Sequence, residues 1–148
     1  ATGLRLSNIT GLQWQCVNLE KEIVWIVADD AKAGKPIGVP LNNDALAVLK
    51  EQLGKHASFV FTFRGKPIVC PNGRAWRNAL KRAGIKNFRW HDLRHTWATR
   101  HVTNGTPPHV LQQLGGWSSY KSMQNYAHLY VEHTKRYTVN VEGIESVC

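Results

Sequence analysis

Acidic residues, clustered cysteines and long apolar runs are all scarce in this sequence. Its 148 residues include 10 Asp and Glu against 19 Lys and Arg, so the net charge is +9. This excess predicts a polyanionic partner. Nucleic acid fits better than an anionic membrane surface, because no basic amphipathic helix has a clean apolar face. No run approaches the roughly 20 apolar residues of a membrane span, and no signal-peptide pattern opens the chain.

The sequence also lacks the residue patterns that usually hold metals. Cys16, Cys70 and Cys148 lie far apart and form no CxxC pair. This argues against a zinc site or a disulfide framework and favours a reducing, intracellular setting. The acidic residues form no cluster of the kind that holds Mg²⁺ in a nuclease. We therefore expect a protein that works without a metal or another cofactor.

The hydrophobic pattern predicts one mostly helical α+β domain with a small three-stranded antiparallel sheet. The β-rich runs are 14–17, 23–27 and 36–40, and Pro36 and Pro40 indicate an edge strand or strand ends. A further β-prone run covers 59–63. The predicted helices are 4–10 with a left-handed cap at Gly11, 43–54 with an apolar stripe of Leu46, Leu49 and Leu53, 74–82, 92–104, 107–114, and 118–128. Because the chain opens Ala1-Thr2-Gly3, we expect a single domain over 1–148 from a longer protein, with a tail at 129–148.

Residues 90–97, with the sequence WHDLRHTW, form the start of the most informative helix. Leu93 and Trp97 lie four apart and predict an inward face, while Asp92 suits the first turn. His91, Arg94 and His95 then share one side of the helix. A basic cluster at a helix N-terminus suits a phosphate, although a solvated polar face is the alternative interpretation.

The predicted helix at 74–82 carries a strongly basic face. Trp76 and Leu80 are expected to face inward. The cationic side chains are Arg74, Arg77, Lys81 and Arg82. Such a face usually does no more than contact solvent. The more specific alternative is contact with a DNA backbone.

Taken together, these pieces resemble the catalytic domain of the tyrosine recombinase, or phage integrase, family. The motifs that carry the resemblance stand in order along almost the whole chain. They are TGLR ending at Arg5, AKAG containing Lys32, HDLRH at 91–95, LGGW ending at Trp117, and Tyr126 nine residues later. Each motif is weak alone, and their order is what makes chance agreement improbable.

The resemblance implies a role for each of these residues. Arg5 and Arg94 would neutralise a scissile phosphate, since guanidinium groups stay charged and bind two oxygens at once. Lys32 would protonate the leaving 5′-oxygen, His91 would assist proton transfer, and Tyr126 would be the nucleophile. Trp117 stands where many relatives have His, and its indole N–H can donate to a phosphate but cannot shuttle a proton.

Several alternatives stay open at these positions. Lys35 rivals Lys32, and Trp117 could serve only core packing. Tyr120 and Tyr130 compete with Tyr126, which only the family position favours. We interpret His95 as a structural or supporting histidine.

One departure from the family pattern affects the first arginine. Asn8 stands where relatives usually have an acidic residue, so we expect Arg5 to be held less firmly. Asn can still accept a hydrogen bond, but it adds no negative charge.

The family implies a site-specific integrase that cuts and rejoins double-stranded attachment-site DNA through a 3′-phosphotyrosyl link, without metal or ATP. The expected setting is the nucleoid-associated cytoplasm of a bacterial host, with a tetramer on synapsed DNA and a monomer when free. A type IB topoisomerase uses the same residue types and is the first rival. A non-catalytic DNA-binding remnant of a prophage integrase is the second.

Overall fold

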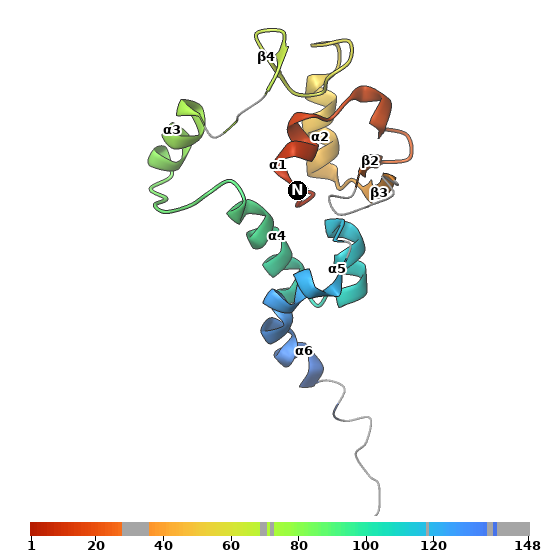
Figure 1. The fold of residues 1–148 in the computed structure, drawn as a ribbon, viewed down its shortest axis with the longest axis vertical. Coiled ribbons are helices and arrows are strands. Elements are labelled where there is room, and N and C mark those ends of the chain that lie inside the picture. Colours follow the sequence, from red (N-terminus) through yellow and green to blue (C-terminus); the bar gives the residue numbers. More distant parts are fainter. Residues whose placement is uncertain (28–35, 69–70, 72, 118, 136–137, 139–148) are drawn as a thin grey trace, which may run out of the picture.

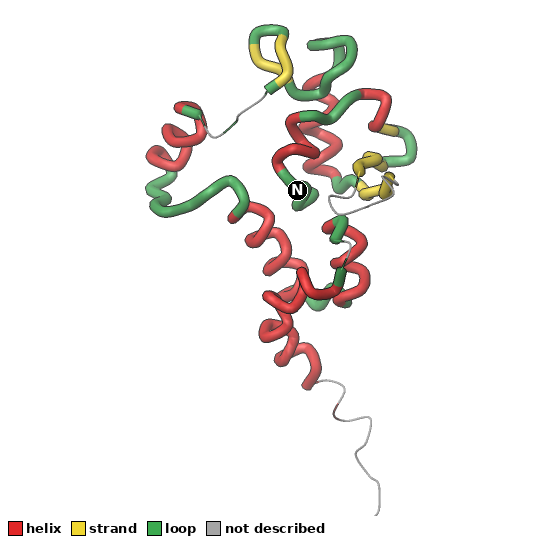
Figure 2. The backbone as a smooth tube through the Cα atoms, in the orientation of Figure 1, coloured by secondary structure: helices red, strands yellow, loops and turns green. Residues whose placement is uncertain are grey.

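The computed structural model describes residues 1–27, 36–68, 71, 73–117, 119–135 and 138. Its α-helices are α1 (Leu6–Thr10), α2 (Asn43–Gln52), α3 (Arg74–Arg82), α4 (Asp92–Thr103), α5 (Pro108–Gly115) and α6 (Val131–Thr134). Two 3₁₀ segments are η1 (Trp14–Cys16) and η2 (Tyr120–Tyr130). The strands are β1 (Val17–Asn18), β2 (Ile23–Val27), β3 (Pro36–Pro40), β4 (Thr62–Phe63) and β5 (Lys66–Pro67). Helices predominate, as the predicted α+β class requires (Figures 1 and 2).

The three-stranded sheet is antiparallel, with the order β1-β2-β3. Val24 and Ile26 of β2 are buried, whereas Trp25 between them is 47% exposed, so the side chains alternate between core and solvent. The strand with a proline at each end, β3, lies at the edge of the sheet, as predicted. The loop that joins β2 to β3, residues 28–35, lies outside the described residues.

The sheet and α2 enclose the first hydrophobic core. The Asn42 side chain accepts a hydrogen bond from the Ala45 backbone N–H over 3.0 Å and caps α2. Leu46 and Leu49 are buried in this core. The predicted apolar stripe was wrong at Leu53, which is 52% exposed because α2 ends before it.

The second hydrophobic core lies where α4 packs against α5 and η2 (Figure 1). Its buried members are Ala98, Val102, Leu111, Met123 and Tyr126. The predicted inward face of α4 was correct at Trp97, which packs against this core, and wrong at Leu93, which is 43% exposed because the buried face runs through position 94. No helix in the described part of the chain is long and apolar enough to cross a membrane.

Three local predictions need correction. Gly11 has a φ of −89° and is not left-handed, because α1 ends with an ordinary turn. The helix expected at 118–128 is instead a 3₁₀ segment, η2, and Ser118 lies outside the described residues. In the β-prone run 59–63 only the last two residues form a strand, which turns back through Arg64 and Gly65 at φ values of 52° and 72°. The end of the tail, 139–148, also lies outside the described residues.

Leu111→Ala should lower the free energy of unfolding by about 2–5 kcal/mol, because it leaves a cavity in the second core. Leu111 is completely buried there. Leu53→Ala removes the same atoms from an exposed position and should cost no more than about 0.5 kcal/mol. Urea denaturation of both variants measures the difference. Equal losses would contradict the two-core arrangement.

Candidate active site

The guanidinium of Arg94 ties three distant parts of the chain together. Arg94 lies in the first half of α4 and is 5% exposed. Its Nη1 donates to the Gly3 carbonyl oxygen over 2.7 Å, and its Nη2 donates to the Gly115 carbonyl oxygen over 2.6 Å. A buried cation needs such charge-assisted bonds. Arg94 therefore connects the segment before α1 with the end of α5.

Both carbonyl partners belong to glycines that lie directly against tryptophans. Gly3 has a φ of 63°, and a Cβ there would collide with the Trp97 ring. A Cβ at Gly115 would collide with the Trp117 ring in the same way. The absence of a side chain lets each backbone approach close enough for its carbonyl to reach Arg94.

Trp117 forms an aromatic surface beneath the guanidinium. The Arg94 Cζ lies 4.3 Å from the centroid of the Trp117 ring, a cation–π distance. The Trp117 ring centroid also lies 6.1 Å from that of Tyr126 and 6.2 Å from that of Trp97. Trp117 thus packs against the second core and touches the buried cation at the same time.

Arg5, His91 and Arg94 line one pocket of about 830 Å³. Arg5 occupies the N-cap position of α1, and His91 precedes the first residue of α4. Burial lowers the pKa of His91, and the nearby charges of His95, Arg94, Arg5 and Arg89 lower it further. The two arginines that the sequence places far apart therefore converge on the same site as the histidine.

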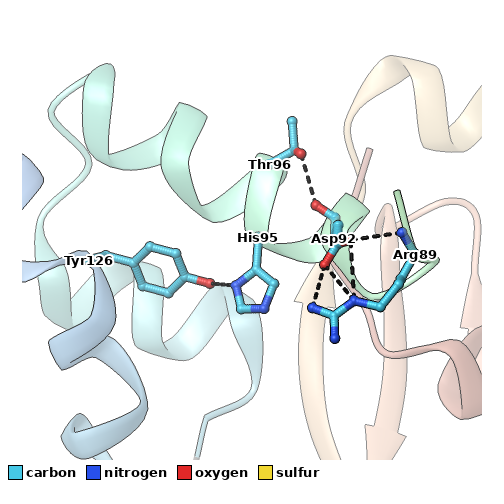
Figure 3. A network of polar contacts seen from close by, with 5 residues as sticks. All are labelled: Arg89, Asp92, His95, Thr96 and Tyr126. Carbon is cyan, nitrogen blue, oxygen red and sulfur yellow. Dashed lines mark hydrogen bonds and ion pairs between the residues drawn. The ribbon is translucent and has the colours of Figure 1, made fainter. Parts of the chain in front are cut away.

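The Tyr126 phenol does not lie open to solvent. Its side chain is 6% exposed, and its hydroxyl oxygen lies 2.6 Å from Nδ1 of His95 (Figure 3). Burial raises the pKa of Tyr126, and the charge of Arg94 opposes that increase. Tyr126 is therefore both a member of the second core and a hydrogen-bond partner of α4.

His95, interpreted from the sequence as a structural or supporting histidine, contacts the Tyr126 hydroxyl in the structure. It lies one turn after His91, and the two imidazole rings are edge to face with centroids 4.9 Å apart. The sequence pattern that could have revealed it is the four-residue spacing between the two histidines. What the pattern could not supply is that η2 brings Tyr126 to the second of them.

Two groups of predicted site residues remain: one falls outside the described residues, and the other is exposed on α3. Lys32 and its rival Lys35 fall outside the described residues. The basic side chains of α3 are all exposed, and α3 stands to one side of both cores (Figure 1). Trp76 does not reach either core, because it packs against Trp90, with ring centroids 4.7 Å apart, and against Phe88. The members of the basic face are Arg74, Arg77, Lys81 and Arg82.

An ion pair fixes the turn before α4 on the side of His95 that faces away from Tyr126 (Figure 3). The Arg89 Nη2 donates to a carboxylate oxygen of Asp92 over 2.9 Å, and the Arg89 backbone N–H donates to the other oxygen over 2.7 Å. These bonds hold the pKa of Asp92 below its usual value. The negative charge of Asp92 at the start of α4 is therefore paired with the guanidinium of Arg89.

Comparison with known proteins places the chain in a family. The sequence pattern of the Phage integrase family matches residues 1–133, and the chain belongs to that family. This confirms the resemblance found in the motifs.

Particular relatives agree. The integrase of Salmonella phage P22 is 41% identical over 97% of this chain and 41% of its own length. A crystal structure of XerA recombinase superposes with a TM-score of 0.73 at 26% identity, over 94% of this chain and 53% of that one. The Tn1549 transposon integrase in complex with circular intermediate DNA gives a TM-score of 0.74 at 20% identity, over 94% and 56%, which supports the fold alone. The chain thus spans about half the length of these relatives or less.

Arg94→Lys should destabilise the protein by about 1–3 kcal/mol. The planar guanidinium donates to two carbonyl oxygens at once, whereas the lysine ammonium cannot reach both and leaves one buried acceptor without a hydrogen bond. Arg100→Lys, at an exposed position on the same helix, is the matched control and should change stability little. Thermal and urea unfolding measure both. Equal stability of Arg94→Lys and the wild type would contradict the bridging role.

Stability should fall as the pH drops below about 6.5, the ordinary pKa of histidine. The pKa of His91 is lowered in the folded protein, so the unfolded chain binds the proton more readily in this range. His91→Asn should reduce the slope of unfolding free energy against pH between 7.5 and 5.5. Part of the slope should remain because burial also lowers the pKa of His101. An unchanged slope in His91→Asn would contradict the assignment.

Proposed function

We propose that this chain cuts and rejoins double-stranded DNA through a covalent 3′-phosphotyrosyl link at Tyr126, as the catalytic part of a site-specific integrase. One observation carries the proposal. Arg5 and Arg94 line one pocket with His91, and the residue after Arg94 holds the Tyr126 phenol. A nucleophile next to two phosphate-binding cations is what metal-free phosphodiester cleavage requires.

The proposed substrate is supported by charge and by relatives. The chain carries a net charge of +9, which suits a polyanion. The P22 relative is called an integrase, and the Tn1549 integrase is described in complex with DNA. We propose that the exposed basic face of α3 contacts the DNA backbone beside the pocket.

In the proposed reaction the Tyr126 oxygen attacks the scissile phosphorus, and the 5′-oxygen leaves. Arg5 and Arg94 offset the charge that builds on the non-bridging oxygens. Lys32 supplies a proton to the leaving oxygen, and Trp117 supports Arg94 from below. Because the phosphotyrosyl bond keeps the energy of the broken linkage, a second 5′-hydroxyl can reverse the step without ATP.

The phenol must move before it can react. Tyr126 is 6% exposed and does not line the pocket that holds Arg5 and His91. Since η2 carries Tyr126, a shift of η2 against α4 is the simplest route. We propose that assembly of four copies on synapsed DNA in the bacterial cytoplasm provides that shift and that the free protein is a monomer.

Tyr126→Phe should abolish the protein–DNA adduct that the full natural protein forms on a nicked suicide duplex carrying its attachment site. The phenylalanine keeps the ring in the core but lacks the attacking oxygen. A denaturing gel run with EDTA present measures the adduct. EDTA should have no effect, because no metal takes part.

Tyr120→Phe and Tyr130→Phe are the matched controls. Tyr120 is 54% exposed, and the Tyr130 hydroxyl donates to the Thr106 carbonyl oxygen over 3.0 Å, away from the pocket. Both variants should retain the adduct. An adduct that survives in Tyr126→Phe would contradict the proposed nucleophile. Salt-sensitive binding without any adduct would instead indicate a DNA-binding remnant, and relaxation of supercoils without site preference would indicate a topoisomerase.

A further inference from the structure

We propose that His95 is a catalytic residue that accepts the phenolic proton of Tyr126 as the phenol leaves its buried position to attack the phosphate. This inference rests on the proposed function of Tyr126 and adds a group that the sequence interpretation had given a structural or supporting role. The supporting geometry is the 2.6 Å contact between the Tyr126 hydroxyl oxygen and Nδ1 of His95 (Figure 3). That distance matches a short hydrogen bond, over which a proton can pass from oxygen to nitrogen.

The buried position of the phenol creates the need for a base. Tyr126 belongs to the second core, and burial raises the pKa of its hydroxyl above the ordinary value of a phenol. Even an ordinary phenol is almost entirely protonated at neutral pH, and this phenol is ionised less readily still. A neighbouring base that takes the proton during attack removes this requirement, and such a base typically contributes about 10²- to 10⁴-fold to a rate.

The other groups near the phenol fit the task less well. The indole of Trp117 has no lone pair to accept a proton, and the guanidinium of Arg94 stays protonated at any working pH. The His91 ring packs edge to face on His95 and lies on the pocket side of it. The Asp92 carboxylate is bonded to Arg89. His95 presents a basic nitrogen directly to the reacting oxygen.

The proposed proton transfer from Tyr126 to His95 needs no other reactant. With the Nε2–H tautomer of His95, the lone pair on Nδ1 accepts the proton as the Tyr126 O–H bond breaks. The phenolate oxygen forms the bond to phosphorus, the bond from phosphorus to the 5′-oxygen breaks, and a separate acid protonates that oxygen. On rejoining, the His95 imidazolium returns the proton to Tyr126.

The charges around the pair connect this transfer to phosphate binding. The titratable and charged groups near His95 and its neighbour are His91, Asp92, Arg94, Arg5 and Arg89. Most are cations, and Arg5, Arg94 and His91 line the pocket. A phosphate in the pocket would offset them, so the proton transfer would be favoured once DNA is bound.

The test isolates the nucleophile's proton by removing the need for an acid on the leaving group. The substrate is a nicked attachment-site duplex whose scissile 5′-oxygen is replaced by sulfur, because a thiolate leaves without a proton. The single-turnover rate of adduct formation by the full natural protein is measured from pH 5.5 to 8.5. The wild-type rate should rise with pH and then level off, because only a neutral imidazole can accept a proton.

His95→Asn keeps an amide at the position of Nδ1 but cannot take a proton. Its adduct should form about 10²-fold or more slowly, at a rate that keeps rising with pH instead of levelling off. Added imidazole should partly restore the rate in His95→Gly. The matched control is His109→Asn, on an exposed part of α5, which should leave both the rate and the pH profile unchanged.

Three results would overturn the proposal. If His95→Asn matches the wild type in rate and pH profile, His95 takes no part in the chemistry. If His95→Ala reacts faster than the wild type, the contact only restrains the phenol. If the wild type forms no adduct even with the sulfur substrate, the proposed function itself fails, and the role of His95 fails with it. The ¹³Cζ resonance of Tyr126, assigned with Tyr126→Phe, should shift in His95→Asn and shows whether the contact exists in solution.

Discussion

The buried charge of Arg94 is the constraint on which the rest of the structure depends. A guanidinium inside a protein is tolerated only where oxygen atoms surround it, and here two backbone carbonyls from different ends of the domain meet that need. Their approach requires glycine at positions 3 and 115, since any side chain would strike a tryptophan. Because of these contacts, the segment before α1 and the end of α5 meet α4 at a single residue.

The site is assembled at the border between two hydrophobic cores. The first core fixes α1 and therefore the position of Arg5. The second core fixes the face of α4 that carries Arg94, and it packs Trp117 and Tyr126 against that face. Neither core alone brings the proposed phosphate-binding arginines and the tyrosine together. The proposed reaction therefore depends on the packing of the two cores against each other. The hydrogen bonds of Arg94 contribute to that packing.

Local sequence patterns predicted much of this arrangement because most helices and strands have boundary-marking residues, such as proline, at their ends. Proline at both ends marked β3 as an edge strand, and the basic helix at 74–82 was predicted with its observed bounds. Periodicity was less reliable near helix ends. Leu53 and Leu93 fit apolar stripes but are exposed, because one follows the last turn of α2 and the other lies in the first turn of α4 beyond the second core.

The site was harder to predict where it depends on tertiary contacts. The order of the motifs indicated that Arg5 and Arg94 should act together, and they do share a pocket. The hydrogen bond between His95 and Tyr126 has no signature in the sequence, because it arises from the path of η2 across α4. That path is a 3₁₀ segment where an α-helix was expected, and the pitch of such a segment sets which side chain meets the imidazole.

The place of Tyr126 in the second core has a consequence for its proposed role as nucleophile. Moving the phenol to a scissile bond would also withdraw an aromatic ring from Leu111 and Met123, and uncovering apolar surface costs roughly 25 cal/mol per Å². In protein that is not bound to DNA, the proposed nucleophile would thus stay buried by the same packing that stabilises the fold. Only binding that replaces the lost contacts could expose the phenol, so the unbound protein would not cleave DNA at random sites.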